Sequence, residues 1–190
     1  MTAKFLCFDG SGREGSMNKK LLDHVVGEVK AAGGTGTVID LSKYNLPLYN
    51  GDLEGDEGLP EAAKQLKELF KEHDGFLIAS PEYNGSFSAL LKNVLDWVSR
   101  PVAGEPSLNC FKGKTVGLMS TTPGKIGGLR GLYQLNTVMF IMGTIVMPEI
   151  VSVPFYKEAF DENGKLKNEA DQKAAANLAQ RIVKVTEALK

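Results

Sequence analysis

Short apolar runs alternate along the chain with longer stretches in which apolar residues recur at helical spacing. The short runs predict strands, and the nearly unbroken ones are typical of strands that are buried on both faces of a sheet. We expect five strands, at residues 5–8, 37–41, 75–80, 115–120 and 144–147. We also expect five helices, one that follows the first strand and stops at residues 32–34, and others at residues 60–71, 88–100, 128–142 and 168–189.

This alternation predicts an α/β protein whose parallel sheet is covered by helices on both faces. At 190 residues the chain has the length of one such domain, so we expect a single domain over residues 1–190. Residues 44–59 contain Pro47 and three glycines and are expected to form a long loop. Ligands bind such sheets at the carboxyl ends of the strands. The turns after the first, third and fourth strands are therefore candidate functional sites.

Charge and cysteine content narrow the class of protein. The 22 Lys and Arg nearly balance the 23 Asp and Glu, which argues against nucleic acid or an anionic membrane as a partner. Cys7 lies in a predicted buried strand and Cys110 in a predicted polar loop, with the spacing of neither a disulfide framework nor a metal site. We expect free thiols in a reducing compartment. Without a signal-peptide pattern or a run of transmembrane length, the chain is expected to be soluble and cytoplasmic.

The turn after the first strand has the composition of a phosphate site. Residues 9–18 are rich in glycine and hydroxyl groups and lead directly into an amphipathic helix. A helix N-terminus offers unpaired N–H groups and a positive dipole end, and both favour a phosphate. Ser11, Ser16 and Asn18 can donate side-chain hydrogen bonds, and Arg13 can add a charge-assisted one. We interpret this turn as a cradle for a single terminal phosphate.

Two other interpretations of this turn stay open. Gly10, Gly12 and Gly15 match the dinucleotide fingerprint, and Asp40 ends the next predicted strand, where a ribose-binding acid would lie. The turn could also be an ordinary strand–helix connection with Ser16 as the N-cap.

Two further turns at the same edge carry polar and aromatic groups. Residues 81–86 follow the third strand, and there Tyr83 offers a flat face and Asn84 an amide to a planar heterocycle. The alternative is a plain turn in which Ser86 caps a helix. Residues 120–124, followed by two glycines, form a hydroxyl-rich turn after the fourth strand. Together the three turns predict a long groove with a phosphate at one end and a ring at the other.

Other motifs favour structural roles. Residues 113–115 end like a P-loop, but Leu108 stands where its first glycine belongs and a strand follows instead of a helix. This excludes an NTPase of that type. His24 and His73 have no acid or nucleophile placed beside them, so both are expected to be structural. The acids of residues 44–59 lack metal-ligand spacing, and no metal site is predicted.

These motifs give the chain a family resemblance. It resembles the flavodoxin-like NADPH-dependent FMN reductases, a family that includes quinone, azo-dye and chromate reductases. The family's Gly-Ser-x-Arg-x-x-Ser-x-Asn pattern falls on residues 10–18, and its Pro-Glu-Tyr-Asn motif falls on residues 81–84. Matches continue at residues 91–93, 96–97, 127–128 and at Arg130.

By this resemblance the fold would be a doubly wound flavodoxin-like sheet of five parallel strands in the order 2-1-3-4-5, holding noncovalent FMN. The first turn would bind the phosphate, the second would line the isoalloxazine ring, and the third would border the flavin. We assign no catalytic side chain, because the chemistry would belong to the flavin. The implied cofactor-binding residues are Ser11, Arg13, Ser16, Met17, Asn18, Pro81, Glu82, Tyr83, Asn84, Ser120, Thr122 and Gly124.

The resemblance also implies a ping-pong reaction, in which NADPH or NADH passes a hydride to FMN and leaves before a small acceptor takes the electrons. Quinones, azo compounds and metal oxyanions are the implied acceptors. Many relatives carry Pro-Gly where this chain has Ser88 and Ala89, and Lys125 enters the third turn; both departures would reshape the opening over the flavin. A flavodoxin-type electron carrier or a non-catalytic flavin-binding protein would share these motifs, but such carriers are usually strongly acidic.

The helix at residues 128–142 predicts self-association. Apolar residues occupy much of its circumference, whereas a helix that covers a sheet needs only one apolar stripe. Trp97 and Val98 are expected to add apolar surface nearby, and exposed apolar patches usually mark interfaces. Arg130 and Tyr133 share a helical face, and both residue types are favoured at interface hot spots. Resemblance to the family, whose members are commonly dimers or tetramers, points the same way, and the alternative is a helix buried in its own subunit.

Overall fold

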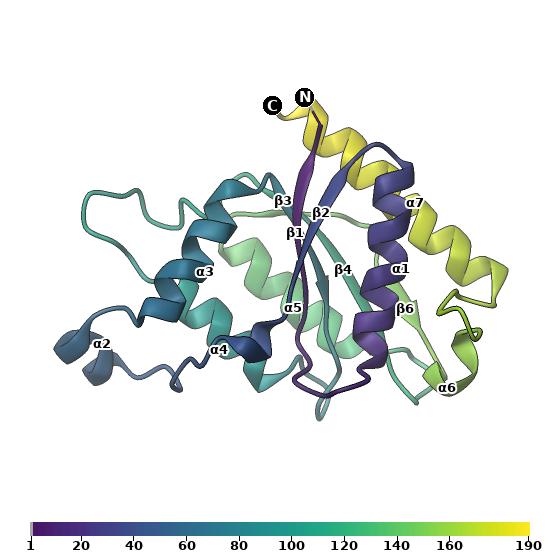
Figure 1. Ribbon diagram of the computed structural model, residues 1–190, viewed down its shortest axis with the longest axis horizontal. Helices are drawn as coiled ribbons and strands as arrows, with labels where there is room; N and C mark the ends of the chain where they lie inside the picture. The colour runs from purple at the N-terminus through teal and green to yellow at the C-terminus, as the bar shows by residue number, and fades with distance from the viewer. Residues whose placement is uncertain (1) are drawn as a thin grey trace.

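The computed structural model describes residues 2–190 as a parallel sheet with the strand order β2-β1-β3-β4-β5 (Figure 1). This confirms the expected order. The strands are β1 Lys4–Asp9, β2 Thr35–Ile39, β3 Gly75–Ala79, β4 Thr115–Thr121, β5 Ile145–Val146 and β6 Val151–Val153. The helices are α1 Met17–Ala31, the 3-10 helix η1 Leu41–Lys43, α2 Gly51–Glu57, α3 Glu61–Glu72, α4 Ala89–Val98, α5 Leu129–Ile141, α6 Tyr156–Ala159 and α7 Glu169–Ala188.

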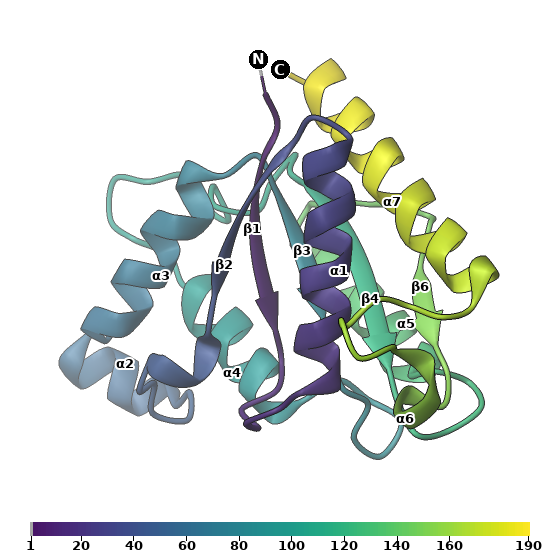
Figure 2. The same ribbon diagram turned by 45° about the vertical axis from the view of Figure 1, so that its right-hand side comes forward.

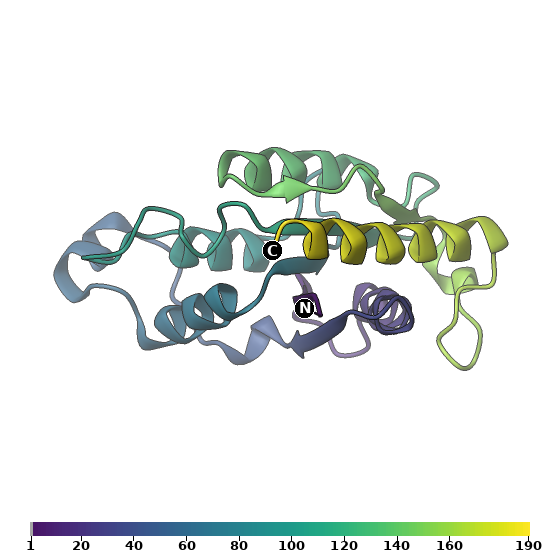
Figure 3. The ribbon, with the colours of Figure 1, turned by 90° about the horizontal axis from the view of Figure 1, so that it is seen from above.

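Helices cover both faces of the sheet because strand side chains alternate between them. Phe5 and Cys7 of β1 pack in the core under α1 and α7, whereas Leu6 and Phe8 pack in the core under α3, α4 and α5. Seen from above, α5 (green) and α1 (purple) lie on opposite sides of the strands (Figure 3). No helix in residues 2–190 combines the length and the hydropathy that crossing a bilayer requires.

The last strand position is filled by two short strands, where the sequence predicted one at residues 144–147. β5 pairs with the start of β4 and β6 with its end, all in parallel. Ile145 lies opposite Thr115 and Val151 opposite Met119, so the chain advances six residues along a stretch that β4 covers in four. The interruption contains Pro148, which has no N–H for the ladder. The sequence therefore located β5 but missed β6.

Residues 44–59, which were expected to form a long loop, contain the helix α2. Asn50 caps its N-terminus, because the Asn50 side-chain oxygen accepts a hydrogen bond from Asp52 N–H (2.8 Å). The preceding part of this segment covers α4. Trp97 donates its indole N–H to the Pro47 carbonyl (2.8 Å) and packs edge-on against Tyr49. Both Trp97 and Val98 are fully buried, so the expectation that they add exposed apolar surface is wrong.

Cys110 also differs from expectation, because it is fully buried rather than part of a polar surface loop. Both cysteines are free thiols, as predicted. Burial raises the pKa of Cys7 to about 12 and raises that of Cys110, so neither is activated toward nucleophilic chemistry.

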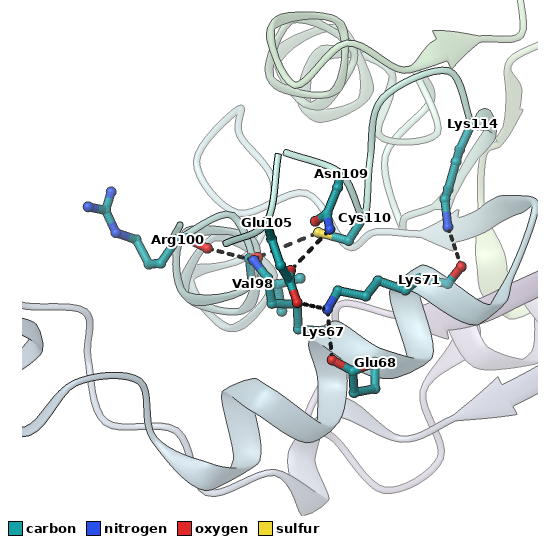
Figure 4. Close-up of polar contacts among 9 residues, drawn as sticks. All are labelled: Lys67, Glu68, Lys71, Val98, Arg100, Glu105, Asn109, Cys110 and Lys114. Carbon is teal, nitrogen blue, oxygen red and sulfur yellow. Dashed lines mark hydrogen bonds and ion pairs between the residues drawn. The ribbon is translucent and has the colours of Figure 1, made fainter. Parts of the chain in front are cut away.

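Two lysines fix the C-terminal ends of α3 and α4 (Figure 4). Lys67 is buried and donates to the carbonyls of Val98 (3.0 Å) and Arg100 (2.5 Å) at the end of α4. Lys114 donates to the carbonyls at the end of α3, among them that of His73 (2.5 Å). Ammonium groups satisfy orphan carbonyls and favour the negative end of the helix dipole. The P-loop-like lysine, Lys114, is therefore a helix cap.

Candidate functional site

The three predicted turns meet in one cleft at the carboxyl ends of β1, β3 and β4, at the lower end of the molecule in Figures 1 and 2. The cleft has a volume of about 210 Å³. Predicted site residues that line it are Ser11, Arg13, Ser16, Met17, Asn18, Pro81, Glu82, Tyr83 and Thr122. Gly15, Thr121, Pro123 and Tyr156 line it as well and were not predicted.

A second cavity of about 410 Å³ adjoins the cleft and shares Glu82, Thr122 and Pro123 with it. The predicted residues Asn84 and Gly124 line this second cavity. Ser120 lines neither of the two. It is fully buried beneath the third turn, where its hydroxyl donates to the Ser80 carbonyl at 2.6 Å.

The first turn presents main-chain donors at the start of α1. Ser16 is the N-cap of α1, and its hydroxyl oxygen accepts a hydrogen bond from Lys19 N–H (3.2 Å). The N–H groups of Gly12, Gly15 and Ser16 donate to no acceptor within residues 2–190. Arg13 is exposed at the same turn. Free N–H groups, a positive helix end and a guanidinium are the donor set that a phosphate requires.

Asn18 joins the first turn to the third. Its side-chain carbonyl accepts from Thr121 N–H (2.9 Å), and its amide donates to the Thr121 carbonyl (3.1 Å). These two bonds hold the start of α1 against the end of β4. Asn18 therefore positions the cleft walls in addition to lining them.

The second turn owes its shape to Asn84 and Gly85. Tyr83 and Ser86 exchange two main-chain hydrogen bonds of 2.8 and 3.0 Å across a two-residue turn. Asn84 and Gly85 both have positive φ, 52° and 81°. A type I′ turn needs positive φ at both central positions, and Asn-Gly is its preferred pair. The turn leaves the Tyr83 ring half exposed at the cleft.

Glu82 anchors this second turn to α5. Its carboxylate accepts hydrogen bonds from Arg130 Nε (2.9 Å) and Gly131 N–H (3.2 Å) and forms an ion pair with the Arg130 guanidinium. Burial alone would raise the pKa of the Glu82 carboxyl, but these bonds outweigh burial and hold the pKa below its usual value. Glu82 is therefore an ionised clamp between the second turn and the N-terminus of α5.

Ser88 connects the start of α4 to the first turn. Its hydroxyl donates to the Gly10 carbonyl (2.5 Å) and accepts from Leu91 N–H (3.2 Å) as the N-cap of α4. A Cβ on Gly10 would lie 2.9 Å from the Ser88 hydroxyl, so the approach requires glycine. The Ser88–Gly10 hydrogen bond holds the start of α4 against the first turn.

Tyr156 is the unpredicted cleft residue that lies outside the three turns. It begins α6, and its N–H donates to the Thr122 carbonyl at 3.1 Å, which places α6 against the third turn. The preceding Phe155 adopts a left-handed conformation (φ 51°) that turns the chain toward the cleft. No periodic pattern around these residues signals this position.

Asp40, the candidate ribose acid, is engaged locally. It caps η1, accepting from Ser42 N–H (3.0 Å) and from the Ser42 hydroxyl (2.7 Å). The strand order β2-β1-β3-β4-β5 is that of the flavodoxin-like rather than the dinucleotide-binding arrangement.

His73 is structural, as expected, since its ring nitrogens contact the Leu69 carbonyl and the Thr37 hydroxyl.

The cleft residues fit a flavin mononucleotide. The N–H groups and the guanidinium of the first turn and the Tyr83 ring line the same cleft, and the Asn84 amide lines the adjoining cavity. A shallow site lined by an aromatic ring and a few converging polar groups is typical of a cofactor site.

Comparisons with known proteins show the family of this chain. The sequence pattern of the NADPH-dependent FMN reductases matches residues 3–158. An NAD(P)H-dependent FMN reductase of Pseudomonas aeruginosa is 34% identical over 182 residues, covering 94% of this chain and 91% of that protein. A 2-hydroxy-1,4-benzoquinone reductase of a Burkholderia species is 31% identical over 175 residues, covering 91% and 90%.

A solved structure shows the same fold over the whole length. FerB, a flavoenzyme NAD(P)H:(acceptor) oxidoreductase from Paracoccus denitrificans, superimposes with a TM-score of 0.82 at 28% identity, covering 98% of both chains. On this sequence match and this shared fold, the chain belongs to the NADPH-dependent FMN reductase family.

Proposed function

We propose that this chain, acting as a single domain over residues 1–190, is an NAD(P)H-dependent oxidoreductase that holds FMN noncovalently and reduces quinones. The observation that carries the proposal is the meeting of the three turns in one cleft, which both the donor-rich turn before α1 and Tyr83 line. Bound FMN would supply the redox chemistry, accepting a hydride from the nicotinamide and passing electrons to the acceptor.

The protein's own groups would bind FMN and orient it. Arg13 and the free N–H groups of the first turn would hold the phosphate, and Tyr83 would pack against the ring. The Glu82–Arg130 clamp would keep the second turn in place. The adjoining cavity of about 410 Å³ gives the nicotinamide and the acceptor a common place to alternate. Quinone as the acceptor class is supported by the name of the Burkholderia relative, a 2-hydroxy-1,4-benzoquinone reductase.

The experiment that tests this function separates it from an electron carrier or a passive flavin binder. Purified protein loaded with FMN should show a flavin absorbance spectrum, and acid precipitation should release the flavin because it is noncovalent. NADPH or NADH oxidation should be slow alone and fast with a benzoquinone. A flavoprotein that does not oxidise either nicotinamide would be a carrier or a binder instead.

We further propose that the protein is a homodimer or tetramer. α5 exposes Phe140 and Ile141, each with 73% of its surface accessible. Tyr133 is also exposed and lies seven residues before Phe140, about two turns along the same face of the helix. Ile145 of β5 is also exposed. Adjacent large apolar side chains of this kind usually mark a protein interface.

A further inference from the structure

A buried acid lies beneath the proposed phosphate site. Asp9 is the last residue of β1, and only 5% of its surface is accessible. Its side chain accepts a hydrogen bond of 2.7 Å from the Ser16 hydroxyl at the N-terminus of α1. A carboxylate thus occupies the positive end of the helix that the phosphate would also use. An ionised Asp9 would repel the FMN phosphate strongly, because like charges repel in a partly desolvated site.

The hydrogen bonds of Ser16 also oppose phosphate binding while Asp9 is ionised. A hydroxyl has one hydrogen to donate and two lone pairs to accept with. The hydrogen is used by Asp9 (2.7 Å), and one lone pair is used by Lys19 N–H (3.2 Å). While Asp9 is ionised, Ser16 therefore has no hydrogen left for a phosphate, although it lines the cleft.

The carboxylate of Asp9 has no ion-pair partner in the described part of the chain. Burial raises the pKa of the Asp9 carboxyl above its usual value, although the Ser16 hydrogen bond opposes this. Asp40, which follows β2, raises the pKa further, whereas Lys19 of α1 and the main-chain N–H of Ser11 lower it.

Solvent can reach the group from the outer side of the turn. Asp9 lines a cavity of about 710 Å³ that shares Ser11, Arg13 and Ser16 with the cleft. The charged and titratable groups around this cavity are Arg13 and Glu14 of the turn, Lys19 of α1, and Asp40, Lys43 and Tyr44 beyond β2. On the β3 side, Asp9 neighbours Ala79, which carries no charge.

We propose that Asp9 is a positioning residue that takes up a proton when the phosphate of FMN enters the first turn, and thereby turns the Ser16 hydroxyl toward that phosphate. The proton comes from solvent and adds to a carboxylate oxygen. The new acid O–H donates to the free lone pair of Ser16, and the Ser16 hydrogen then donates to a phosphate oxygen. No charge is left facing the phosphate from β1. This inference rests on the proposed function, because it requires FMN to bind at the first turn.

The consequence is a proton linked to cofactor binding. FMN affinity should fall as pH rises, by up to about tenfold per pH unit for one linked proton. Riboflavin has no phosphate and should lack this dependence. The Asp9→Asn variant has the shape of the protonated acid, with an amide that can donate to Ser16. It should bind FMN without proton uptake.

The test titrates the apoprotein with FMN and with riboflavin by flavin fluorescence, from about pH 5 to 8, in wild type and in Asp9→Asn. The phosphate of FMN itself titrates near pH 6, and this effect is common to both proteins. We expect the ratio of the FMN dissociation constants, wild type over Asp9→Asn, to rise at least tenfold across this range. The Glu14→Gln variant, which removes an exposed carboxylate of the same turn, should follow the wild type.

Calorimetry of the wild type with FMN and with riboflavin, in two buffers of different ionisation enthalpy, measures proton uptake directly and does not depend on any variant folding. At about pH 7.5, where the FMN phosphate is already mostly ionised, uptake with FMN should exceed uptake with riboflavin. A pH-independent ratio of dissociation constants, or equal proton uptake with the two flavins, would overturn the role of Asp9 while leaving the FMN site intact. A wild type that binds no FMN would overturn this role and the proposed function together.

Discussion

The second turn allows a prediction that separates a backbone role from a side-chain role. Asn84 has a φ of 52° between two main-chain hydrogen bonds, so the turn holds it in the left-handed region. Alanine pays about 1–2 kcal/mol in that region, whereas glycine adopts it freely. Asn84→Ala should therefore lower the free energy of unfolding by about 1–2 kcal/mol, and Asn84→Gly should change it little. For a chain of this length the alanine variant should melt roughly 2–8 °C lower.

Flavin binding by the same pair tests the side chain. Asn84→Gly keeps the turn but removes the amide at the second cavity, so any loss of FMN affinity reports a lost hydrogen bond, worth about 0.5–1.5 kcal/mol. Thermal unfolding by circular dichroism and FMN titration of each apoprotein are the measurements. Equal melting temperatures for the alanine and glycine variants would refute the argument from φ. An FMN dissociation constant in Asn84→Gly identical to that of the wild type would show that Asn84 serves the turn alone.

Three further changes test other parts of the structure. Arg13→Ala removes a charge-assisted contact of about 1.5–3 kcal/mol, so FMN should bind roughly 10–100-fold more weakly in a fluorescence titration while riboflavin binding stays the same; equal loss for both flavins would place the phosphate elsewhere. Lys67→Met leaves the two carbonyls at the end of α4 without their donor and should cost about 2–4 kcal/mol in urea unfolding, whereas the exposed Lys64→Met should cost almost nothing, and similar costs for the two would contradict the helix-cap role. Phe140→Asp should shift the mass found by light scattering from a dimer or tetramer to a value near 20.5 kDa, and a wild type already at that mass would exclude the oligomer.

Local patterns in the chain were enough to predict the fold and the proximity of the three polar turns. The unbroken apolar runs of β1, β3 and β4 follow from burial on both faces, and the Gly-Ser turn before α1 follows from helix capping. Because parallel strands place their carboxyl ends at one edge, the three polar turns had to lie near one another. The cleft that they form confirms this expectation.

Long-range contacts were beyond the reach of those patterns. β6 is only three residues long and exists because β4 offers it an unpaired edge. Trp97 reads as a surface residue until the distant Pro47 segment covers it. Tyr156 reaches the cleft because its N–H meets the Thr122 carbonyl.

The first turn shows most clearly which features follow from local sequence and which depend on tertiary contacts. By itself, the sequence determined that residues 9–18 join a buried strand to a helix and carry groups that can donate hydrogen bonds to an anion, since capping and glycine chemistry act over a few residues. Only the tertiary structure decided how these donors are used. Folding buries Asp9 and gives it the Ser16 hydrogen, and it commits Asn18 to Thr121, more than one hundred residues away. A hydroxyl or an amide can serve only a few partners, and which partners are near depends on the packing of the whole chain.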